Sequence, residues 1–351
     1  MSINIYPIPR VLTTNPYLDL LYAPFTAWPE LRIVRQPFAQ SLRAGLLQRD
    51  QRVLHWHFFD ELTQRPRQSA TALRSISFIA LLRLLHVRGA KLVWTAHNVE
   101  PHELRHPAWA TRCYRAMAQA AGQIIVHSQA AAQLIDQRYQ VATKTTVIAH
   151  GSYIGVYGER LEQAFARQQL GLAAEGFLAL NLGTLRPYKG VELLIEAWTA
   201  ELGQLEIVGA VKDPLYVQQL QQLASAPTIT IRPQFIADQL LPAWFAAADV
   251  VVLPYRKTLT SGMLLAALSY ARPVVAPDLP PVRELIREGE NGFLFEPNNV
   301  ASLRSALQRA AAHPNRQALH QNALQTVQHL EWAQLAAQTA NVYRRLFEKN
   351  S

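Results

Sequence analysis

The loop at residues 182–190 has the residue types that bind a phosphate group. Its sequence, LGTLRPYKG, lies between a predicted strand and a predicted helix. Gly183 and Thr184 bring backbone close to a ligand, Arg186 and Lys189 supply two cations, and the helix that follows adds free N–H groups and a positive dipole end. The loop therefore predicts a diphosphate site. The alternative is a solvated loop with two ordinary surface cations.

A second strand-to-helix loop, residues 255–262, has the sequence YRKTLTSG. Ser261 and Gly262 lie where the N-cap and first free amides of the next helix are expected, so the loop can also hold an anion. Helix capping explains Ser261 and Gly262 about as well. Capping does not explain why two loops in the same half of the chain both carry cations.

Ionisable side chains gather after a predicted strand in the first half of the chain. Residues 94–103, WTAHNVEPHE, place His97, Glu100 and Glu103 at the carboxyl end of a strand that begins at residue 91. Histidine titrates near neutral pH, whereas either glutamate would need an apolar or anionic setting to act as a base. We expect a general base among these three residues, and the alternative for each is a turn or cap contact.

Further histidines follow other predicted strands, at positions 55, 57, 127 and 150. They point toward the same edge of the predicted sheet. The spacing contains no HExxH motif and no paired cysteines, and one histidine per strand end is commoner as a polar lining group. No metal site is predicted.

Strands and helices that alternate in both halves position these residues. The predicted strands are 3–6, 31–35, 52–57, 91–97, 123–127 and 145–149 in the first half, and 177–182, 205–208, 229–232, 250–254 and 273–276 in the second. Strand and helix alternation is typical of parallel α/β sheets. We expect an α/β protein with two doubly wound, Rossmann-like domains, 1–170 and 171–330, facing a central cleft that holds the site, and a helix at 331–351 that crosses back.

The composition agrees with a two-domain globular protein. The chain has 351 residues, half of them apolar and 17% charged, which excludes disordered, collagen-like and coiled-coil proteins. The single cysteine, Cys113, cannot form an internal disulfide, and no leader sequence is present, so a cytoplasmic protein is expected. The apolar stretch at 75–87 is interrupted by Arg83 and is shorter than a membrane span.

The net charge of +9 lies in the first half of the chain. Residues 1–168 hold 19 Lys+Arg and 10 Asp+Glu, whereas residues 169–351 hold 15 of each. A basic half beside a neutral one predicts an anionic partner for the first half, either nucleic acid or an acidic membrane leaflet. The alternative is a basic surface that serves solubility.

Residues 177–297 resemble the donor-nucleotide domain of GT-B glycosyltransferases, especially family 4. Gly183, Arg186 and the pair at 189–190 match the loop that binds the donor's diphosphate in that family. Further blocks match in the same order: LPY at 253–255, SG at 261–262, ARPVVA at 271–276, and Glu284 with ENGFL at 290–294. The resemblance implies that the segment near Phe235 and Ile236 holds the nucleobase, and that His97 lies near the donor sugar.

The chain departs from the family at two positions. Retaining family 4 enzymes carry two glutamates eight positions apart, and these positions are Thr258 and Ala266 here. Neither side chain can ionise, so a carboxylate that contacts the donor sugar is missing. This departure argues against the usual retaining mechanism and leaves room for an inverting one, in which a base from the first half deprotonates the attacking hydroxyl.

The resemblance implies an acceptor-binding domain at 1–170, with Asn15 and Tyr17 on the acceptor side, and a donor-binding domain at 171–330. It extends to bacterial exopolysaccharide enzymes, and residues 97–103 are similar to those of their β-mannosyltransferases. The implied reaction transfers a hexose, with mannose or glucose favoured, from a nucleotide diphosphate sugar such as GDP-mannose to a lipid-linked saccharide.

No metal or other cofactor is expected, because Arg186, Lys189 and helix amides can stabilise a departing nucleoside diphosphate. The expected partners are the nucleotide sugar, the lipid-linked acceptor and an anionic membrane at the inner face of the cell membrane. Two alternatives are a nonhydrolysing sugar-nucleotide epimerase of the same architecture and a basic nucleic-acid-binding protein. Against the latter, the aromatic residues are not interleaved with the basic ones, and no nucleic acid is expected as a partner.

Overall fold

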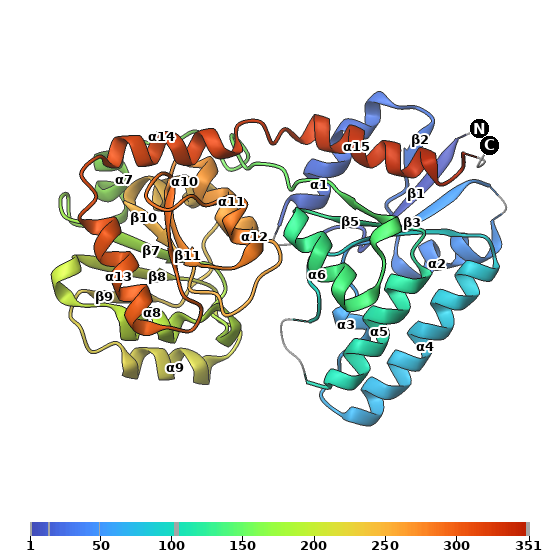
Figure 1. The fold of residues 1–351 in the computed structure, drawn as a ribbon, viewed down its shortest axis with the longest axis horizontal. Helices are drawn as coiled ribbons and strands as arrows, with labels where there is room; N and C mark the ends of the chain where they lie inside the picture. Colours follow the sequence, from blue (N-terminus) through green and yellow to red (C-terminus); the bar gives the residue numbers. More distant parts are fainter. Residues whose placement is uncertain (1, 13–14, 49, 102–104, 349–351) are drawn as a thin grey trace. The chain divides into compact units, whose positions relative to one another are not determined.

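The computed structural model describes residues 2–12, 15–48, 50–101 and 105–348, and the chain divides into two units (Figure 1). Unit 1 comprises residues 1–151 and 330–351, and unit 2 comprises residues 152–329. The division at 151/152 differs from the predicted boundary near 170. The physical reason is α7 (Gln163–Leu170), whose buried Ala166 packs against α10 (Leu241–Ala247) of unit 2.

Unit 1 contains a six-stranded sheet in which every pair of neighbouring strands is parallel. The strands are β1 (Ile3–Ile8), β2 (Leu31–Ile33), β3 (Arg52–Trp56), β4 (Lys91–Thr95), β5 (Gln123–Val126) and β6 (Thr145–Val147). Their order is β2-β1-β3-β4-β5-β6, so the sheet is doubly wound, with its switch point between β1 and β3. Buried strands such as Ile124–Val126 are continuous apolar runs because helices cover both faces.

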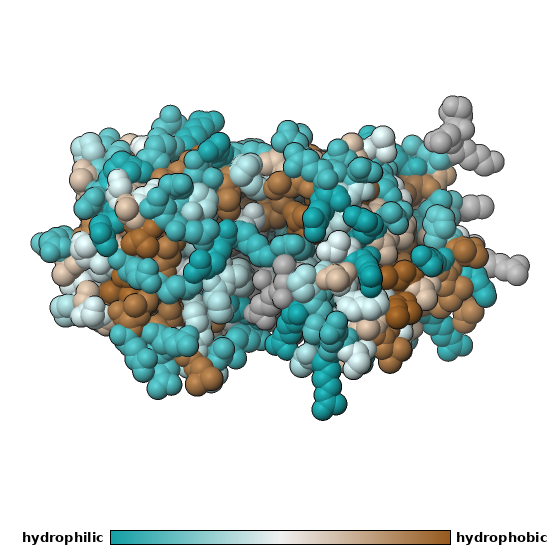
Figure 2. Space-filling model, turned by 60° about the horizontal axis from the view of Figure 1, so that its bottom comes forward, coloured by the Kyte–Doolittle hydropathy of each residue, from teal (hydrophilic) through white to brown (hydrophobic). Residues whose placement is uncertain are grey.

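The helices of unit 1 include one contributed from far along the chain. They are α1 (Tyr17–Tyr22), α2 (Phe38–Leu47), α3 (Asp60–Thr63), α4 (Gln68–Val87), α5 (Pro107–Ala120), α6 (Gln129–Tyr139) and α15 (Trp332–Arg345). α15 lies beside α1 and completes the core around Ile5 and Leu18 with Leu335 and Tyr343 (Figure 1). On the surface of this unit, hydrophobic side chains lie next to hydrophilic ones (Figure 2, right).

Unit 2 contains a second six-stranded parallel sheet. The strands are β7 (Leu178–Leu182), β8 (Gln204–Val208), β9 (Ile229–Arg232), β10 (Val250–Val252), β11 (Val274–Pro277) and β12 (Gly292–Phe295), in the order β12-β11-β10-β7-β8-β9. The remaining helices are α8 (Val191–Ala197), α9 (Pro214–Leu223), α11 (Gly262–Ser269), α12 (Pro280–Arg283), α13 (Val300–Ala311) and α14 (Arg316–Val327). The predicted fold class, with two doubly wound parallel sheets, is confirmed.

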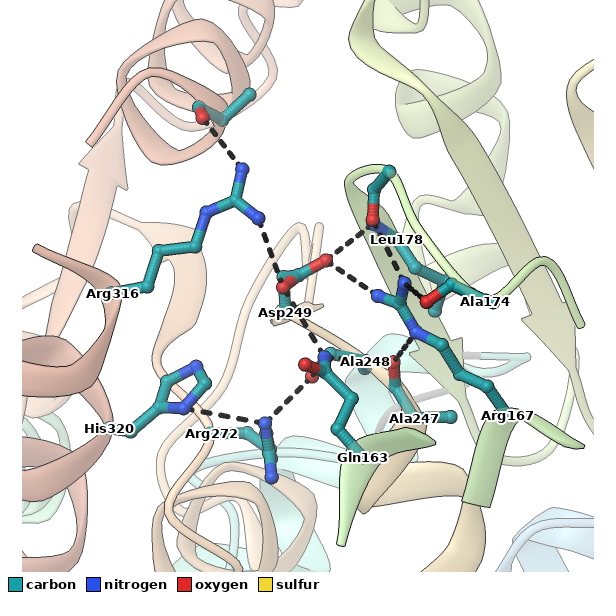
Figure 3. A network of polar contacts seen from close by, with 12 residues as sticks. Gln163, Arg167, Ala174, Leu178, Ala247, Ala248, Asp249, Arg272, Arg316 and His320 are labelled. Atoms are coloured by element: carbon teal, nitrogen blue, oxygen red, sulfur yellow. Dashed lines mark hydrogen bonds and ion pairs between the residues drawn. The ribbon is translucent and has the colours of Figure 1, made fainter. Parts of the chain in front are cut away.

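A buried carboxylate ties the linker segment and α14 to the sheet of unit 2 (Figure 3). Asp249, which precedes β10, pairs with Arg167 of α7 at 3.0 Å and with Arg316 of α14 at 3.3 Å. It also accepts a hydrogen bond from the backbone N–H of Leu178 at 2.8 Å. Because Asp249 and Arg167 are buried, the network fixes α7 to unit 2 and explains why residues 152–170 fold with it.

Candidate functional site

In the sheet of unit 2, the order in which successive strands are added reverses between β7 and β10. β8 and β9 lie on one side of this central pair, and β11 and β12 lie on the other. In open α/β sheets ligands bind beyond the carboxyl ends of the strands at such a switch point. The loops that follow β7 and β10 are residues 183–190 and 253–261, so both predicted anion loops lie at the switch point.

In the first loop, the ammonium group of Lys189 lies over the backbone of Gly183. A Cβ added at Gly183 would lie 2.5 Å from Lys189 Nζ, and Gly183 has φ +126°, which an L side chain rarely adopts. The N–H of Gly183 donates to the carbonyl of Val208 at 2.9 Å, which holds the turn against β8. The backbone conformation therefore favours glycine at 183, whereas the ammonium group of Lys189, at the end of a flexible side chain, can shift away from a Cβ.

The two loops pack directly on each other. Gly190 has φ +67°, and a Cβ there would lie 2.2 Å from the carbonyl oxygen of Pro254. The N–H of Arg256 donates to the carbonyl of Tyr188 at 3.1 Å. Glycine at 190 thus allows the end of the first loop to approach the start of the second.

Lys189 is a cation whose pKa is lowered in the folded protein. Burial, with a smaller effect from nearby Arg186, lowers the pKa of Lys189 from 10.5 to about 8. Among the residues that the structure describes, no ion pair involves Lys189. A partly dehydrated ammonium beside a second cation favours a bound anion, which is what a diphosphate site needs.

In the second loop, the serine caps a helix and the arginine is paired within unit 2. Ser261 accepts a hydrogen bond from the N–H of Leu264 at 3.1 Å, so it is the N-cap of α11, as the capping alternative requires. Arg256 pairs with Glu192 at 2.5 Å and donates to Asn298 at 3.0 Å, so that guanidinium is already engaged within unit 2. Gly262 begins α11 directly after the cap.

The other predicted positions of unit 2 have different environments. Thr258 is half-buried and Ala266 is buried in α11, so neither position provides a carboxylate. Phe235, between β9 and α10, is 67% exposed, whereas Ile236 beside it is buried. The exposed ring of Phe235 can stack on a planar group.

In unit 1, four histidines form a row at the carboxyl ends of four neighbouring strands. His57, His97, His127 and His150 follow β3, β4, β5 and β6 in that order. The ring centroids of successive histidines lie 5.7, 5.2 and 5.3 Å apart. Since parallel strands end at one edge, the sequence predicts this shared edge, and the structure brings the four rings into contact distance.

Tyr17 of α1 packs against all four rings of the row. Its ring centroid lies 5.7 Å from His57, 5.0 Å from His97, 5.8 Å from His127 and 5.0 Å from His150. The side chain of Asn15 accepts a hydrogen bond from the N–H of Tyr17 at 2.9 Å, which fixes the start of α1. The structure therefore places Tyr17 beside His97, and Asn15 beside Tyr17.

A chain of polar contacts runs inward from His97. His97 Nε2 lies 3.5 Å from His57 Nδ1, and His57 Nε2 lies 3.0 Å from the hydroxyl of Tyr22. That hydroxyl lies 2.8 Å from His55 Nδ1, whose other ring nitrogen lies 2.7 Å from the hydroxyl of Thr95. This series of contacts limits the tautomers that His97 can adopt, because the donor in each contact determines which nitrogen of the next ring must accept.

Burial keeps the row neutral at pH 7. Loss of solvation, reinforced by the neighbouring histidines, holds the pKa of His97 well below its usual range, and burial lowers the pKa of His127 to about 4 and of His150 to about 3. A neutral imidazole can accept a proton, but a low pKa makes it a weaker base than the sequence predicts. The direction of this pKa shift differs from the prediction that His97 titrates near neutral pH.

The carboxylates of unit 1 that could act as a base have different environments. Glu100 is half-buried in the segment after β4, where the carbonyl of neighbouring Val99 accepts a hydrogen bond from Tyr139 at 2.6 Å. Glu103 lies outside the described residues. Asp60, at the start of α3 after β3, was not predicted: burial raises its pKa to about 6, and the hydroxyl of Tyr114 donates to it at 2.9 Å.

Asp60 has the raised pKa that suits a general base. The sequence signal that could have identified it is its place directly after Phe59, shortly beyond the end of β3. As for metals, within the described part of the chain no group of three or more His, Cys, Asp or Glu side chains could hold an ion.

Two family models match the chain, one in each half. Residues 11–152 match Glycosyltransferase Family 4, and residues 176–313 match Glycosyl transferases group 1. The chain is 32% identical over 301 residues to the GDP-mannose:glycolipid 4-beta-D-mannosyltransferase of Xanthomonas campestris pv. campestris, an alignment that covers 84% of this chain and 79% of that protein. It is 25% identical over 252 residues to a D-inositol 3-phosphate glycosyltransferase of Nocardioides sp., which covers 65% and 55% of the two chains.

Solved structures with the same fold cover nearly the whole chain. Anabaena Alr3699/HepE in complex with UDP and glucose matches with a TM-score of 0.74 and 20% identity, over 98% of this chain and all of that one. Sucrose-phosphate synthase from Thermosynechococcus elongatus matches with a TM-score of 0.73 and 18% identity, over 99% of each chain.

Proposed function

The chain belongs to the GT-B glycosyltransferases, and on that premise we propose that it transfers mannose from GDP-mannose to a saccharide carried by a lipid. The observation that carries this proposal is the 32% identity over most of a protein named for GDP-mannose and a glycolipid. The ammonium of Lys189 at the switch point of unit 2 supports it, because this group makes no ion pair with a described residue and the donor brings a diphosphate. The product belongs to exopolysaccharide or glycolipid synthesis.

On this proposal unit 2 holds the leaving group. Lys189 and Arg186 contact the diphosphate, Gly183 and Thr184 bring backbone to it, and Ser261 and Gly262 present the start of α11. When the glycosidic C–O bond breaks, negative charge develops on the diphosphate, and these cations stabilise it. Phe235 and Ile236 contact the nucleobase. No metal is needed for this stabilisation.

The acceptor hydroxyl is deprotonated as its oxygen attacks the anomeric carbon, and the proton passes to a base of unit 1. Direct displacement of this kind inverts the anomeric configuration. Three described groups are candidates for the base: His97, Glu100 and Asp60. The absence of a carboxylate at Thr258 and Ala266 supports inversion, and the pKa of about 6 supports Asp60 as an addition to the three predicted residues, of which Glu103 lies outside the described part.

The test combines product stereochemistry with single variants. Purified protein is incubated with GDP-mannose or UDP-glucose and a lipid-linked oligosaccharide, and NMR follows the anomeric proton of the product. We expect transfer from GDP-mannose with inversion. Among H97A, E100Q, E103Q and D60N, one variant should lower kcat by about a hundred- to ten-thousandfold with donor affinity unchanged.

The stereochemistry of the product and its dependence on an acceptor distinguish the mechanisms. Retention of configuration would contradict the inverting mechanism but not transfer itself. Conversion of the donor sugar without an acceptor would instead identify an epimerase. Because the acceptor is a lipid, we also propose that the protein works at the anionic cytoplasmic face of the cell membrane.

A further inference from the structure

Helix α4 has apolar side chains on two opposite faces. On one face Phe78, Leu82 and Leu85 are buried, and Phe78 stacks on Phe59 with ring centroids 5.2 Å apart. By length and composition α4 is the one described helix that could cross a membrane, since the helix begins at Gln68 and is longer than the apolar stretch at 75–87. Its inner face is packed within unit 1, so α4 can contact a bilayer only from its outer face.

The outer face carries a continuous apolar stripe. Its members, spaced three or four residues apart, are Leu73, Ile76, Ala80, Leu84 and Val87. All are exposed, and the exposed fractions of Leu73, Ile76, Leu84 and Val87 are 68%, 55%, 43% and 79%. Fourteen residues separate the ends, so the stripe is about 21 Å long at 1.5 Å per residue. Exposed apolar side chains are common singly, but a helix face with this spacing marks a contact surface.

Cations flank the stripe and no acid interrupts it. Arg74 and Arg83 are exposed on either side, Arg67 and Arg88 lie at the two ends, and residues 64–91 contain no Asp or Glu. Among the described residues, none of these four arginines takes part in an ion pair. Unit 1 as a whole has 20 Lys+Arg and 10 Asp+Glu, whereas unit 2 has 14 and 15.

We propose that the outer face of α4 is the surface by which this protein docks on an anionic lipid bilayer. The apolar stripe enters the boundary between headgroups and acyl chains, while the flanking arginines remain at the level of the lipid phosphates. This proposal rests on the proposed function in one respect, namely that the acceptor is a lipid. The docking proposal and the proposed function are tested by different measurements, because docking to vesicles is measured without enzymatic turnover.

Charge complementarity selects the bilayer over a second copy of this chain. Two copies that met through this face would bring the arginines of one helix next to those of the other, with no carboxylate in residues 64–91 to pair with them. An anionic membrane neutralises the same arginines, and its interior accepts the stripe. Binding through both components should be only partly sensitive to salt, since salt screens the arginines and not the apolar contact.

The test measures partition of the full chain onto vesicles by cosedimentation. Vesicles of phosphatidylcholine alone are compared with vesicles that contain phosphatidylglycerol, at low and high NaCl. The stripe variant is L73Q/I76Q/V87Q, and the matched control is F165Q/L215Q/L223Q, which makes the same change at exposed positions of unit 2. A third variant, R74Q/R83Q, removes the flanking charges.

We expect wild type and control to bind anionic vesicles alike. The stripe variant should bind on the order of a hundredfold more weakly at both salt concentrations. The variant without Arg74 and Arg83 should bind about thirtyfold more weakly at low salt and like wild type at high salt.

Equal binding of the stripe variant and the control would overturn the proposal. So would equal binding of wild type to neutral and anionic vesicles. Sedimentation velocity supplies the last check: a wild-type dimer that the stripe substitutions convert to a monomer would make this face an interface between copies. Loss of mannosyl transfer to a water-soluble acceptor would concern the proposed function and not the docking surface.

Discussion

Replacing Lys189 by methionine should change stability and donor binding in opposite directions. Methionine keeps most of the side chain's length and apolar volume but removes the ammonium. The lysine pKa is about 8 instead of 10.5, and this difference corresponds to roughly 3 kcal/mol against the charged form in the free protein. Without a bound anion, Lys189→Met should therefore stabilise unit 2 by up to about that amount at pH 7.

The sign follows from proton linkage. Between pH 8 and 10.5 the unfolded state binds more protons at this position than the folded state, so wild-type stability should rise with pH across that window. Below pH 8 both states are protonated and the destabilisation of the folded state is constant. The stability of Lys189→Met should lack this rise.

Donor binding should show the reverse effect. A charge-assisted contact with the diphosphate is worth about 1.5 to 3 kcal/mol, so Lys189→Met should lower the affinity for a nucleoside diphosphate about ten- to a hundredfold. Above pH 8 the wild-type affinity should also fall, because binding requires the protonated lysine. Isothermal titration with GDP from pH 7 to 10 measures this loss, and urea unfolding without ligand measures stability.

The matched control is Arg287→Ala, which removes an exposed cation of the same unit. It should leave GDP affinity and its pH dependence unchanged. A Lys189→Met variant that bound GDP as tightly as wild type would refute the assignment of the diphosphate site. A variant that was less stable than wild type would refute the argument that Lys189 is held without an anionic partner.

Three further outcomes test the structure itself. Asp249→Ala should destabilise unit 2 by about 3 to 5 kcal/mol in urea unfolding, because it leaves Arg167 buried without its carboxylate; a loss below about 1 kcal/mol would contradict the network. The free energy of unfolding of unit 1 should fall between pH 7 and 5 by about 2 kcal/mol for each of His127 and His150. Their folded pKa values, about 4 and about 3, lie below the pKa of histidine in the unfolded chain. A free energy of unfolding that does not change with pH would show that neither histidine is buried in its neutral form. Gly190→Ala should lower stability and GDP affinity more than Gly171→Ala, since both have positive φ but a Cβ at Gly190 would also meet Pro254; equal effects would leave backbone strain as the whole cause.

The sequence predicts the sheets well because their signal is local. All six strands of unit 1 and five of the six strands of unit 2 coincide with predicted apolar runs. The exception is β12, a four-residue edge strand that begins with Gly292, whose missing side chain makes room for the carbonyl of Val274.

The site was predictable where it depends on short-range spacing. Gly183, Arg186 and Lys189 lie within seven residues, and their strand-to-helix context follows from the flanking runs. The environment of the histidines was not predictable. The hydroxyl of Tyr343 lies 2.5 Å from His55, 288 positions earlier, and the pKa of Asp60 depends on burial and on Tyr114, 54 positions later.

The first unit is closed by a segment that the ribosome makes after the whole of the second. Residues 330–348 supply α15, which contributes Leu335 and Tyr343 to the core of unit 1. During synthesis unit 2 is complete at residue 329, while the sheet of unit 1 still lacks one of its covering helices. All residues of unit 2 are therefore made before the last residues of unit 1, although unit 1 begins first. Until then the apolar side chains of unit 1 that pack with Leu335 and Tyr343 lack that cover.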